Sequence, residues 1–379
     1  MTTSIDVLDG AALERLEPGH GRRAYLAALA HDGTRSYVEN ADVELKVVVV
    51  DGTALPLLVG RDVEGNTDLC SPLAHYVLYT LEELAKRRRG IPPALLQAVT
   101  RPPATVLRLA GIDRAVFLNN WLWSTNPSLS LDSTQLAALT TALAAAHPDA
   151  AIVVRSVNPE LDPDGTARLR ESGYRLVRSR RVYLVDPCSA AYSARSNSRE
   201  DAALLGRTPY GIETRPDVLA PHVPRMAQLY RDLYVEKHSR LNARLTERFF
   251  ALTLDEAVFS YCGFVRDGRL DAFIAWYVHS DTMTATILGY DQTLPRTLGL
   301  YRLTVAGITA AARERGLRLN LSGGSGPFKM LRGAVPVEEF DAVYDRHLPL
   351  HRRLAWTLLG VATGWAATTR VDRRARPAR

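Results

Sequence analysis

The stretch that decides the fold is LYRLTVAGITAAARERGLRLNLSGGSGPFK, which spans Leu300 to Lys329. Apolar residues recur at helical spacing from Leu300 to Arg315, which predicts a helix with one apolar face. Gly316 ends that helix, and the apolar run Leu317–Leu321 predicts a strand directly after it. A helix that leads straight into a strand is typical of a mixed α/β sheet with a crossover connection.

The loop after this strand combines small residues with a cation. Gly323, Gly324 and Gly326 allow positive φ and close backbone approach, so successive N–H groups can face an anion or a carbonyl oxygen. Lys329 follows as a point charge suited to a phosphate or to a developing oxyanion. The alternative is a solvated loop that needs its glycines only to turn.

Further elements on both sides of a central connector suggest a duplication. In the second half, the sequence predicts helices over Val223–Lys237 and Thr246–Leu254 and strands over Ala257–Arg266, Leu270–Val278 and Thr282–Tyr290. In the first half, it predicts a hairpin over Glu44–Gly60 around Asp51-Gly52, helices over His75–Arg88, Thr134–Ala146 and Thr166–Ser172, a strand over Ala151–Val157 and a hairpin-like region over Tyr174–Val185. Ser189–Gly211 lacks periodicity and is predicted to connect the halves. The fold class is therefore α/β, with two similar halves built on mixed sheets.

The second half resembles the FemAB-like, tandem-GNAT acyltransferases. Two helices, a meander, a long helix and a strand follow one another in the order of the GNAT fold. The resemblance rests on Gly299–Leu303 at the start of the long helix, Leu319–Gly324 running into the loop, and Phe328-Lys329. Arg332-Gly333-Ala334 stands where the peptidoglycan-building members usually have a Phe-Gly pair, which argues against a cell-wall substrate.

The resemblance implies two tandem GNAT-like domains, a degenerate one over residues 1–190 and an acyltransferase domain over 205–345, followed by a basic tail over 346–379. It implies an amide-forming enzyme that binds no cofactor permanently and transfers an activated acyl group to a small-molecule or peptide amine, as in specialised metabolism. The donor stays open between acyl-CoA or a carrier-protein thioester and aminoacyl-tRNA. The rival interpretation is a binding module that keeps the fold without catalysis.

Two residues at the end of the predicted meander are candidates for proton transfer. Asp291 could accept a proton from the attacking amine, and Tyr290 could protonate the leaving group. The alternative for Asp291 is a strand-end carboxylate that caps the following turn.

The start of the long helix is the candidate site for the donor's phosphates. Free backbone N–H groups and the helix dipole favour an anion there, and Arg296, Tyr301 and Arg302 lie at that end. The alternative is a solvated helix start with a packed tyrosine ring.

Lys237, His238 and Asn242 follow the first helix of the second half, in a segment that resembles the family's substrate-facing loop. His238 is the histidine best placed to act as a general base or a substrate contact. Lys237 and Asn242 are the candidate substrate-binding residues beside it.

Composition excludes several other classes of protein. Among 379 residues, no GxSxG, GxxxxGK[ST], GxGxxG or HExxH is present, which removes the main support for serine-hydrolase, P-loop, dinucleotide-binding and zincin chemistry. The three cysteines are widely spaced, so neither a zinc site nor a disulfide framework is expected. A net charge of +6 is compatible with phosphate-bearing partners such as coenzyme A or tRNA, although a surface rich in arginine for compositional reasons is the plainer interpretation.

The termini carry the expectations about location. Met1–Gly10 lacks the pattern of a signal peptide, and the apolar run Leu354–Thr369 is too short to span a bilayer, so a cytoplasmic protein without integral membrane association is expected. DNA is not expected as a partner. The arginine-rich tail is predicted to begin as a helix packed on the domain; an anionic membrane surface or RNA is the alternative partner for it.

Overall fold

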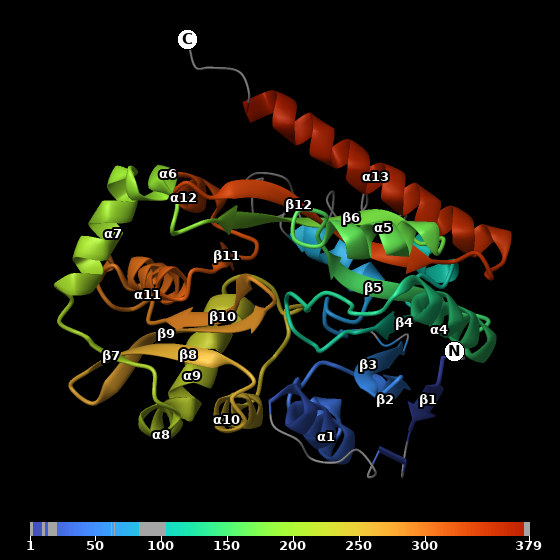
Figure 1. Cartoon of the computed structure of the whole chain (residues 1–379), viewed down its shortest axis with the longest axis horizontal. Coiled ribbons are helices and arrows are strands. Elements are labelled where there is room, and N and C mark those ends of the chain that lie inside the picture. The colour runs from blue at the N-terminus through green and yellow to red at the C-terminus, as the bar shows by residue number, and fades with distance from the viewer. Residues whose placement is uncertain are drawn as a thin grey trace.

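One mixed sheet joins the two halves of the chain (Figure 1). The computed structural model describes residues 3–9, 12–13, 21–61, 63, 65–82 and 104–374, with side chains described as far as residue 364. Within these residues the sheet has twelve strands in the order β1-β2-β3-β4-β5-β12-β6-β11-β10-β9-β8-β7. Neighbours in sequence pair at both ends of the sheet, and strands of the two halves alternate at its centre.

The first half forms one end of this sheet. Its strands are β1 (Ile5–Leu8), β2 (Val43–Val50), β3 (Thr53–Gly60), β4 (Ala115–Leu118) and β5 (Ala151–Val157). The predicted hairpin is confirmed as β2 and β3, and Asp51 and Gly52 between them both have positive φ, 44° and 84°, as tight hairpin turns require. The predicted helix before β5 is α4 (Ser133–Ala146), whose crossover lets β4 and β5 lie parallel.

The second half repeats this arrangement at the other end. Its strands are β7 (Gly211–Glu213), β8 (Ser260–Arg266), β9 (Arg269–His279), β10 (Thr282–Tyr290) and β11 (Arg318–Asn320). The predicted meander is confirmed, since β8, β9 and β10 pair antiparallel in succession. The predicted long helix is α11 (Leu300–Glu314), which crosses over so that β11 lies parallel to β10.

The last strand of each half is exchanged with the other half. β6 (Arg175–Val185) follows α5 (Pro163–Glu171) of the first half and pairs with β11, whereas β12 (Val335–Tyr344) follows α12 (Gly326–Met330) of the second half and pairs with β5. β6 and β12 pair with each other at the centre. The strand pattern is thus the same when read inward from either end, which confirms two tandem copies of one mixed α/β fold.

The exchange explains one wrong prediction. The expected hairpin-like region over Tyr174–Val185 is a single strand, β6, with no partner from its own neighbourhood in sequence. Both of its partners come from the second half, and pairing over such a distance leaves no local turn signal for a sequence pattern to report.

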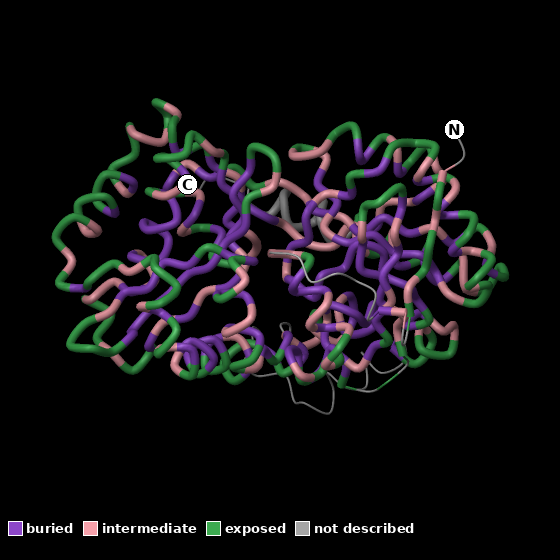
Figure 2. The backbone as a smooth tube through the Cα atoms, turned by 60° about the horizontal axis from the view of Figure 1, so that its bottom comes forward, coloured by how far each residue is buried: buried purple, intermediate pink, exposed green. Residues whose placement is uncertain are grey.

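The halves also share an aromatic core. Helices α1 (Arg22–Asp32) and α10 (Glu247–Asp255) come from different halves, yet the rings of Tyr25 and Phe249 pack edge to face with centroids 6.1 Å apart. α9 (Val223–Tyr230) continues through a wider π-type turn over Arg231–Glu236, which confirms the predicted helix there. Figure 2 shows buried residues within both halves, and one cluster of buried apolar residues has members from both, among them Tyr25 and Phe249.

The connector between the halves is helical, contrary to the aperiodic loop that was predicted. It contains α6 (Ala190–Ser193) and α7 (Ser196–Gly206). α7 buries only Ser198 and Asp201, so it lacks the apolar stripe by which a sequence announces a surface helix. Ion pairs of Asp201 with two arginines of the second half hold α7 in place instead.

Two further predicted helices are confirmed in part. The segment from Pro72 to Glu82 is helical, whereas the basic end predicted at Lys86–Arg89 lies outside the described residues. The tail begins as α13 (Leu350–Arg374), and Trp356, only 2% exposed, packs it on the domain. Within the described part of the chain, no helix has both the length and the apolar composition that crossing a bilayer requires.

Candidate functional site

The parallel strands β10 and β11 pair over only three residues and then separate. The ladder joins Thr282–Thr284 to Arg318–Asn320, after which β10 continues to Tyr290 while the chain leaves β11 into the glycine-rich loop. Thr286 forms a bulge in the pairing of β10 with β9, and its carbonyl accepts from Ser124 Oγ of the first half at 3.1 Å. Beyond Thr284, no strand of the described residues pairs with the edge of β10 that faces β11.

The glycine-rich loop is tightly wound. Ser322, Gly324 and Ser325 have φ of 58°, 73° and 47°, so left-handed residues recur along four positions. At Gly326 a Cβ atom would lie 1.9 Å from the Tyr183 hydroxyl, so only glycine fits there. Gly323 stands more openly, since its Cβ would meet the Arg181 carbonyl at 3.5 Å, an ordinary contact.

Lys329 points into this loop and not out of it. The ammonium, in a side chain only 4% exposed, donates to the carbonyls of Leu321, Ser322 and Gly323 at 2.7, 3.2 and 2.6 Å. Burial, with a smaller contribution from the Arg180 guanidinium, lowers the pKa of Lys329 to about 7. In this arrangement Lys329 holds the loop in shape, and no donor of its ammonium remains for a phosphate.

Aromatic rings line the place where β10 and the loop diverge. Tyr290, Tyr301 and Phe328 follow one another with centroid distances of 5.9 and 4.9 Å. Burial raises the pKa of Tyr290, which the nearby Arg296 partly offsets, and burial also raises the pKa of Tyr301. Both phenols thus keep their protons at neutral pH, so they can donate a proton but not accept one.

Asp291 has its oxygens engaged. Its carboxylate accepts from Arg225 at 2.6 Å and from the Thr293 backbone N–H at 2.9 Å, with Arg269 3.7 Å away. Burial raises the pKa of Asp291, but the Thr293 bonds and Arg225 outweigh it and lower the pKa overall. This geometry is that of the turn-capping alternative, and a catalytic role for Asp291 remains a prediction.

The N-termini of the two crossover helices differ. The N-cap of α11 is Gly299, in left-handed conformation with φ 65°, and no side chain among the described residues caps the helix. The equivalent helix α4 of the first half is closed by a capping box, in which Asp132 accepts from the Gln135 N–H at 2.8 Å and Gln135 accepts in return. The positive end of α11 is therefore available to an external anion, whereas a carboxylate already occupies that of α4.

The arginines predicted beside this helix start have different surroundings. Arg296 is exposed one turn before α11 and acts on Tyr290 through its charge. Arg302 is committed to Asp201, with Nε 2.8 Å from the carboxylate. Of these two cations, only Arg302 forms an ion pair with a described residue.

The predicted substrate-facing loop splits into exposed and structural members. Lys237 and His238 are exposed; Lys237 donates to Gln292 at 2.6 Å, and the His238 ring lies 6.2 Å from that of Tyr234. Asn242 donates to the Tyr234 carbonyl at 2.8 Å and so braces the chain that follows α9.

Sequence patterns missed an arginine at the centre of the sheet. Arg180 of β6 binds Glu339 of β12 at 2.7 Å and donates to Thr125 Oγ1 at 2.6 Å, so one side chain ties the exchanged strands to a loop of the first half. Neighbouring carboxylates raise the pKa of Arg180 against the opposing effect of burial. Only the run of arginines in Arg178–Arg181 could have signalled it.

Comparison with protein families gives one match: the model of the acetyltransferase (GNAT) domain fits residues 189–330. This confirms the GNAT resemblance of the second half. Comparison with curated proteins gives no match.

Three solved structures of similar arrangement have low sequence identity to this chain. FemX covers 59% of this chain and 80% of its own at 11% identity and a TM-score of 0.46. L-PGS from Bacillus licheniformis aligns with 60% of this chain over 78% of its own length, at 15% identity and a TM-score of 0.42. A tandem GNAT protein from the clavulanic acid biosynthesis pathway aligns with 90% of this chain over 98% of its own length, at 13% identity and a TM-score of 0.37.

Proposed function

Because residues 189–330 form a GNAT acyltransferase domain, we propose that the protein is an N-acyltransferase that passes an acyl group from a thioester, either acyl-CoA or an acyl carrier protein, to a small-molecule or peptide amine in specialised metabolism. The observation that carries this proposal is the separation of β10 from β11 beside the uncapped start of α11. Together they offer unpaired strand N–H groups for an acyl carbonyl and a positive helix end for the donor's phosphates.

In the proposed reaction the amine attacks the thioester directly. The donor's phosphates lie at the N-terminus of α11 near Arg296, and its acyl carbonyl accepts from N–H groups of β10 beyond Thr284. The C–N bond forms as the C–S bond breaks, and Tyr290 gives its proton to the leaving sulfur. His238 is the proposed proton acceptor, and most of the rate comes from positioning.

The residues of the loop act as supports in this proposal. Lys329 fixes the carbonyls of the loop, Gly324 supplies a left-handed residue for its turn, and Gly323 lies beside the Arg181 carbonyl of β6. Asn242 and Lys237 hold the segment that follows α9 through their bonds to Tyr234 and Gln292, and the amine is proposed to enter beside this segment. Asp291 keeps the turn after β10 in place.

The difference between the two helix starts supports catalysis by one half only. Asp132 fills the anion position of α4, so we propose that residues 1–190 are a degenerate copy and that residues 205–345 bind the donor. The basic tail over residues 346–379 takes no part in this proposal.

An aminoacyl-tRNA donor is the second candidate, and the net charge of +6 favours it. A tRNA ester presents the same two features as a thioester, a phosphate and an activated carbonyl. A thermal-shift titration with acetyl-CoA and a gel shift with total tRNA separate the candidates. Binding of neither would leave the non-catalytic binding module as the better description.

A matched pair of variants tests the helix start itself. Gly299→Asp places a carboxylate where the donor phosphate is proposed, and Gly299→Asn has the same shape and the same tolerance of the left-handed conformation without the charge. We expect Gly299→Asp to weaken donor binding about tenfold or more relative to Gly299→Asn, since helix-end charges contribute up to about 2 kcal/mol. Equal affinities in the two variants would show that the phosphate lies elsewhere.

A further inference from the structure

Helix α13 packs on the domain through one face. Ala355, Trp356 and Leu359 are buried and belong to the apolar cluster that also contains Val177 of β6. Their spacing along the chain places all three on the same side of the helix. The contact with β6 therefore fixes which side of α13 faces away from the domain.

The side of α13 that faces away carries a row of aliphatic side chains. Leu350, Leu354, Leu358 and Val361 are between 50 and 67% exposed, and their spacing of four, four and three residues places them along one line of the helix. These four residues are the outer stripe of α13. Single exposed apolar residues are ordinary on protein surfaces, but a continuous row of them indicates a contact surface. The sequence extends the same spacing with Trp365, four residues after Val361.

The positive charge of the chain is concentrated in the same segment. Residues 346–379 contain eight arginines and a single acidic residue, Asp372, which gives them a net charge of +7. The whole chain has a net charge of +6, so residues 1–345 together carry −1. Five of the eight arginines lie in the last ten residues. An aliphatic stripe followed by a cluster of arginines is typical of helices that lie in the surface of an anionic bilayer.

Two carboxylates beside the start of α13 are offset by arginines. Asp345 lies 3.0 Å from Arg175, and Asp149 lies 3.6 Å from Arg352. Each pair is close to neutral, so neither carboxylate opposes an anionic partner of the tail.

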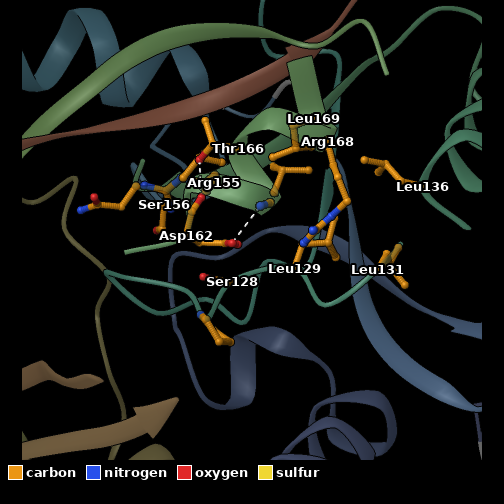
Figure 3. A pocket seen from close by; sticks show the side chains of 15 residues that line it. Ser128, Leu129, Leu131, Leu136, Arg155, Ser156, Asp162, Thr166, Arg168 and Leu169 are labelled. Atoms are coloured by element: carbon orange, nitrogen blue, oxygen red, sulfur yellow. Dashed lines mark hydrogen bonds between the residues drawn. The ribbon is translucent and has the colours of Figure 1, made fainter. Parts of the chain in front are cut away.

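The acidic residues of α5 lie across the sheet from α13. Leu169 of α5 and Leu176 of β6 belong to a second apolar cluster, whereas Val177 belongs to the cluster that contains the buried side of α13. Consecutive residues of a strand point to opposite faces of the sheet, so α5 and α13 cover opposite faces of β6. Figure 3 shows Asp162 at the start of α5, where its Oδ1 lies 2.8 Å from the Gly165 N–H. These carboxylates therefore do not share the surface that the outer stripe exposes.

We propose that α13 docks the protein on the surface of an anionic phospholipid bilayer, with the outer stripe at the level of the acyl chains and the arginines of the last ten residues among the headgroup phosphates. Contact with the domain and contact with the bilayer use opposite sides of one helix, so both hold at once. Figure 1 shows the C-terminal end of α13 clear of the other elements, which leaves room for the bilayer beside it. The helix lies on the bilayer and does not span it. The docking does not depend on the proposed acyl transfer.

Co-sedimentation of the full chain with vesicles tests the docking. Vesicles of phosphatidylglycerol and phosphatidylcholine in equal parts are compared with vesicles of phosphatidylserine and phosphatidylcholine in equal parts and with phosphatidylcholine alone. We expect both anionic mixtures to bind at least tenfold more tightly than phosphatidylcholine, and the difference to shrink as the salt concentration rises. Equal binding to all three vesicles, or to none, overturns the proposal. Binding that requires one of the two anionic headgroups also overturns it, because it would indicate a pocket for that lipid.

Matched variants locate the contact on α13. Leu354→Glu and Leu358→Glu are each expected to weaken binding at least tenfold, because each removes a buried aliphatic side chain from the bilayer contact and brings a charge into it. Ile212→Glu is the control, since it makes the same kind of change at an exposed residue of the edge strand β7. It should bind vesicles as the wild type does. Undiminished binding of Leu354→Glu and Leu358→Glu, with the fold checked by circular dichroism, overturns the proposal.

The arginines are tested by a separate variant. Replacement of Arg370, Arg373 and Arg374 by glutamine is expected to weaken binding to both anionic mixtures at least tenfold and to leave binding to phosphatidylcholine unchanged. An equal loss on all three vesicles would show that charge does not direct the docking and would overturn the proposal.

Two other occupants of this surface give different results. A second copy of the chain would appear in light scattering as a dimer that Leu358→Glu converts to a monomer. RNA would give a gel shift with total tRNA that needs the arginines but not the outer stripe. Either result without vesicle binding overturns the proposal. Leu358→Glu is expected to bind acetyl-CoA as the wild type does, so the docking and the proposed function fail separately.

Discussion

Burial of the Lys329 ammonium predicts an unusual dependence of stability on pH. The side chain is 4% exposed, and burial, with Arg180 nearby, lowers its pKa from 10.5 to about 7. The unfolded chain takes up a proton on this lysine below pH 10.5, but the folded protein resists until about pH 7. Lowering the pH through this window therefore favours the unfolded state, and the stability that Lys329 contributes above pH 10.5 is lost toward pH 7.

The magnitude follows from the width of the window. One pH unit corresponds to about 1.4 kcal/mol when a single proton distinguishes the two states. Between pH 7 and 9, with half a proton already bound to the folded protein at pH 7, wild type should gain about 2 kcal/mol relative to Lys329→Met. The three loop carbonyls that lose their donor in the variant lower its stability at both pH values, so this loss cancels from the comparison.

Urea unfolding followed by tryptophan fluorescence measures this difference. Wild type and Lys329→Met are unfolded at pH 7 and at pH 9, and Lys237→Met serves as the control because Lys237 is exposed. The difference between wild type and Lys237→Met should not change with pH. A flat difference for Lys329→Met as well would mean that the three carbonyls fully offset burial, and the reasoning from desolvation would be wrong.

Two further substitutions test the packing around the site by the same unfolding assay. Asp201→Asn removes a buried charge from its two arginine partners and should cost about 3 kcal/mol, whereas Glu200→Gln, at a side chain 64% exposed, should change stability by less than about 1. Equal effects would show that α7 is not held by Asp201. Gly326→Ala would place a Cβ 1.9 Å from the Tyr183 hydroxyl and should cost about 1–3 kcal/mol. Gly206→Ala, with nothing within 4 Å, should be neutral or stabilising by up to about 1 kcal/mol; a tolerated Gly326→Ala would refute the close approach.

Local patterns were sufficient for elements whose signals lie within a few residues. The Asp51-Gly52 turn predicted the β2–β3 hairpin because both residues must adopt positive φ. The apolar stripe of Leu300–Glu314 predicted α11, and the strand after it follows from the crossover. The sequence did not predict α6, which is only four residues long, or α7, which has no apolar face.

The site divides in the same way. The proposal of an anion site at the start of α11 came from the sequence, since a glycine directly before a helix is a local feature. The observed bonds of Lys329 to the loop carbonyls could not be predicted from the sequence. A spacing of residues does not tell whether a side chain projects from a loop or folds back onto its carbonyls. Asn126 and Asn158 each precede a proline, which signals a turn but not that both residues line one cavity between the two halves.

What the sequence determined alone is the elements with strong local signals, among them the β2–β3 hairpin, the β8–β10 meander and the crossover from α11 into β11 and the glycine-rich loop. The tertiary structure decided the exchange of β6 and β12. This exchange brings Arg180 beside Glu339, which lies 159 residues further along the chain. Pairing over that distance is chosen by burial of whole faces and not by any local preference. The cavity between the halves exists only because of that choice.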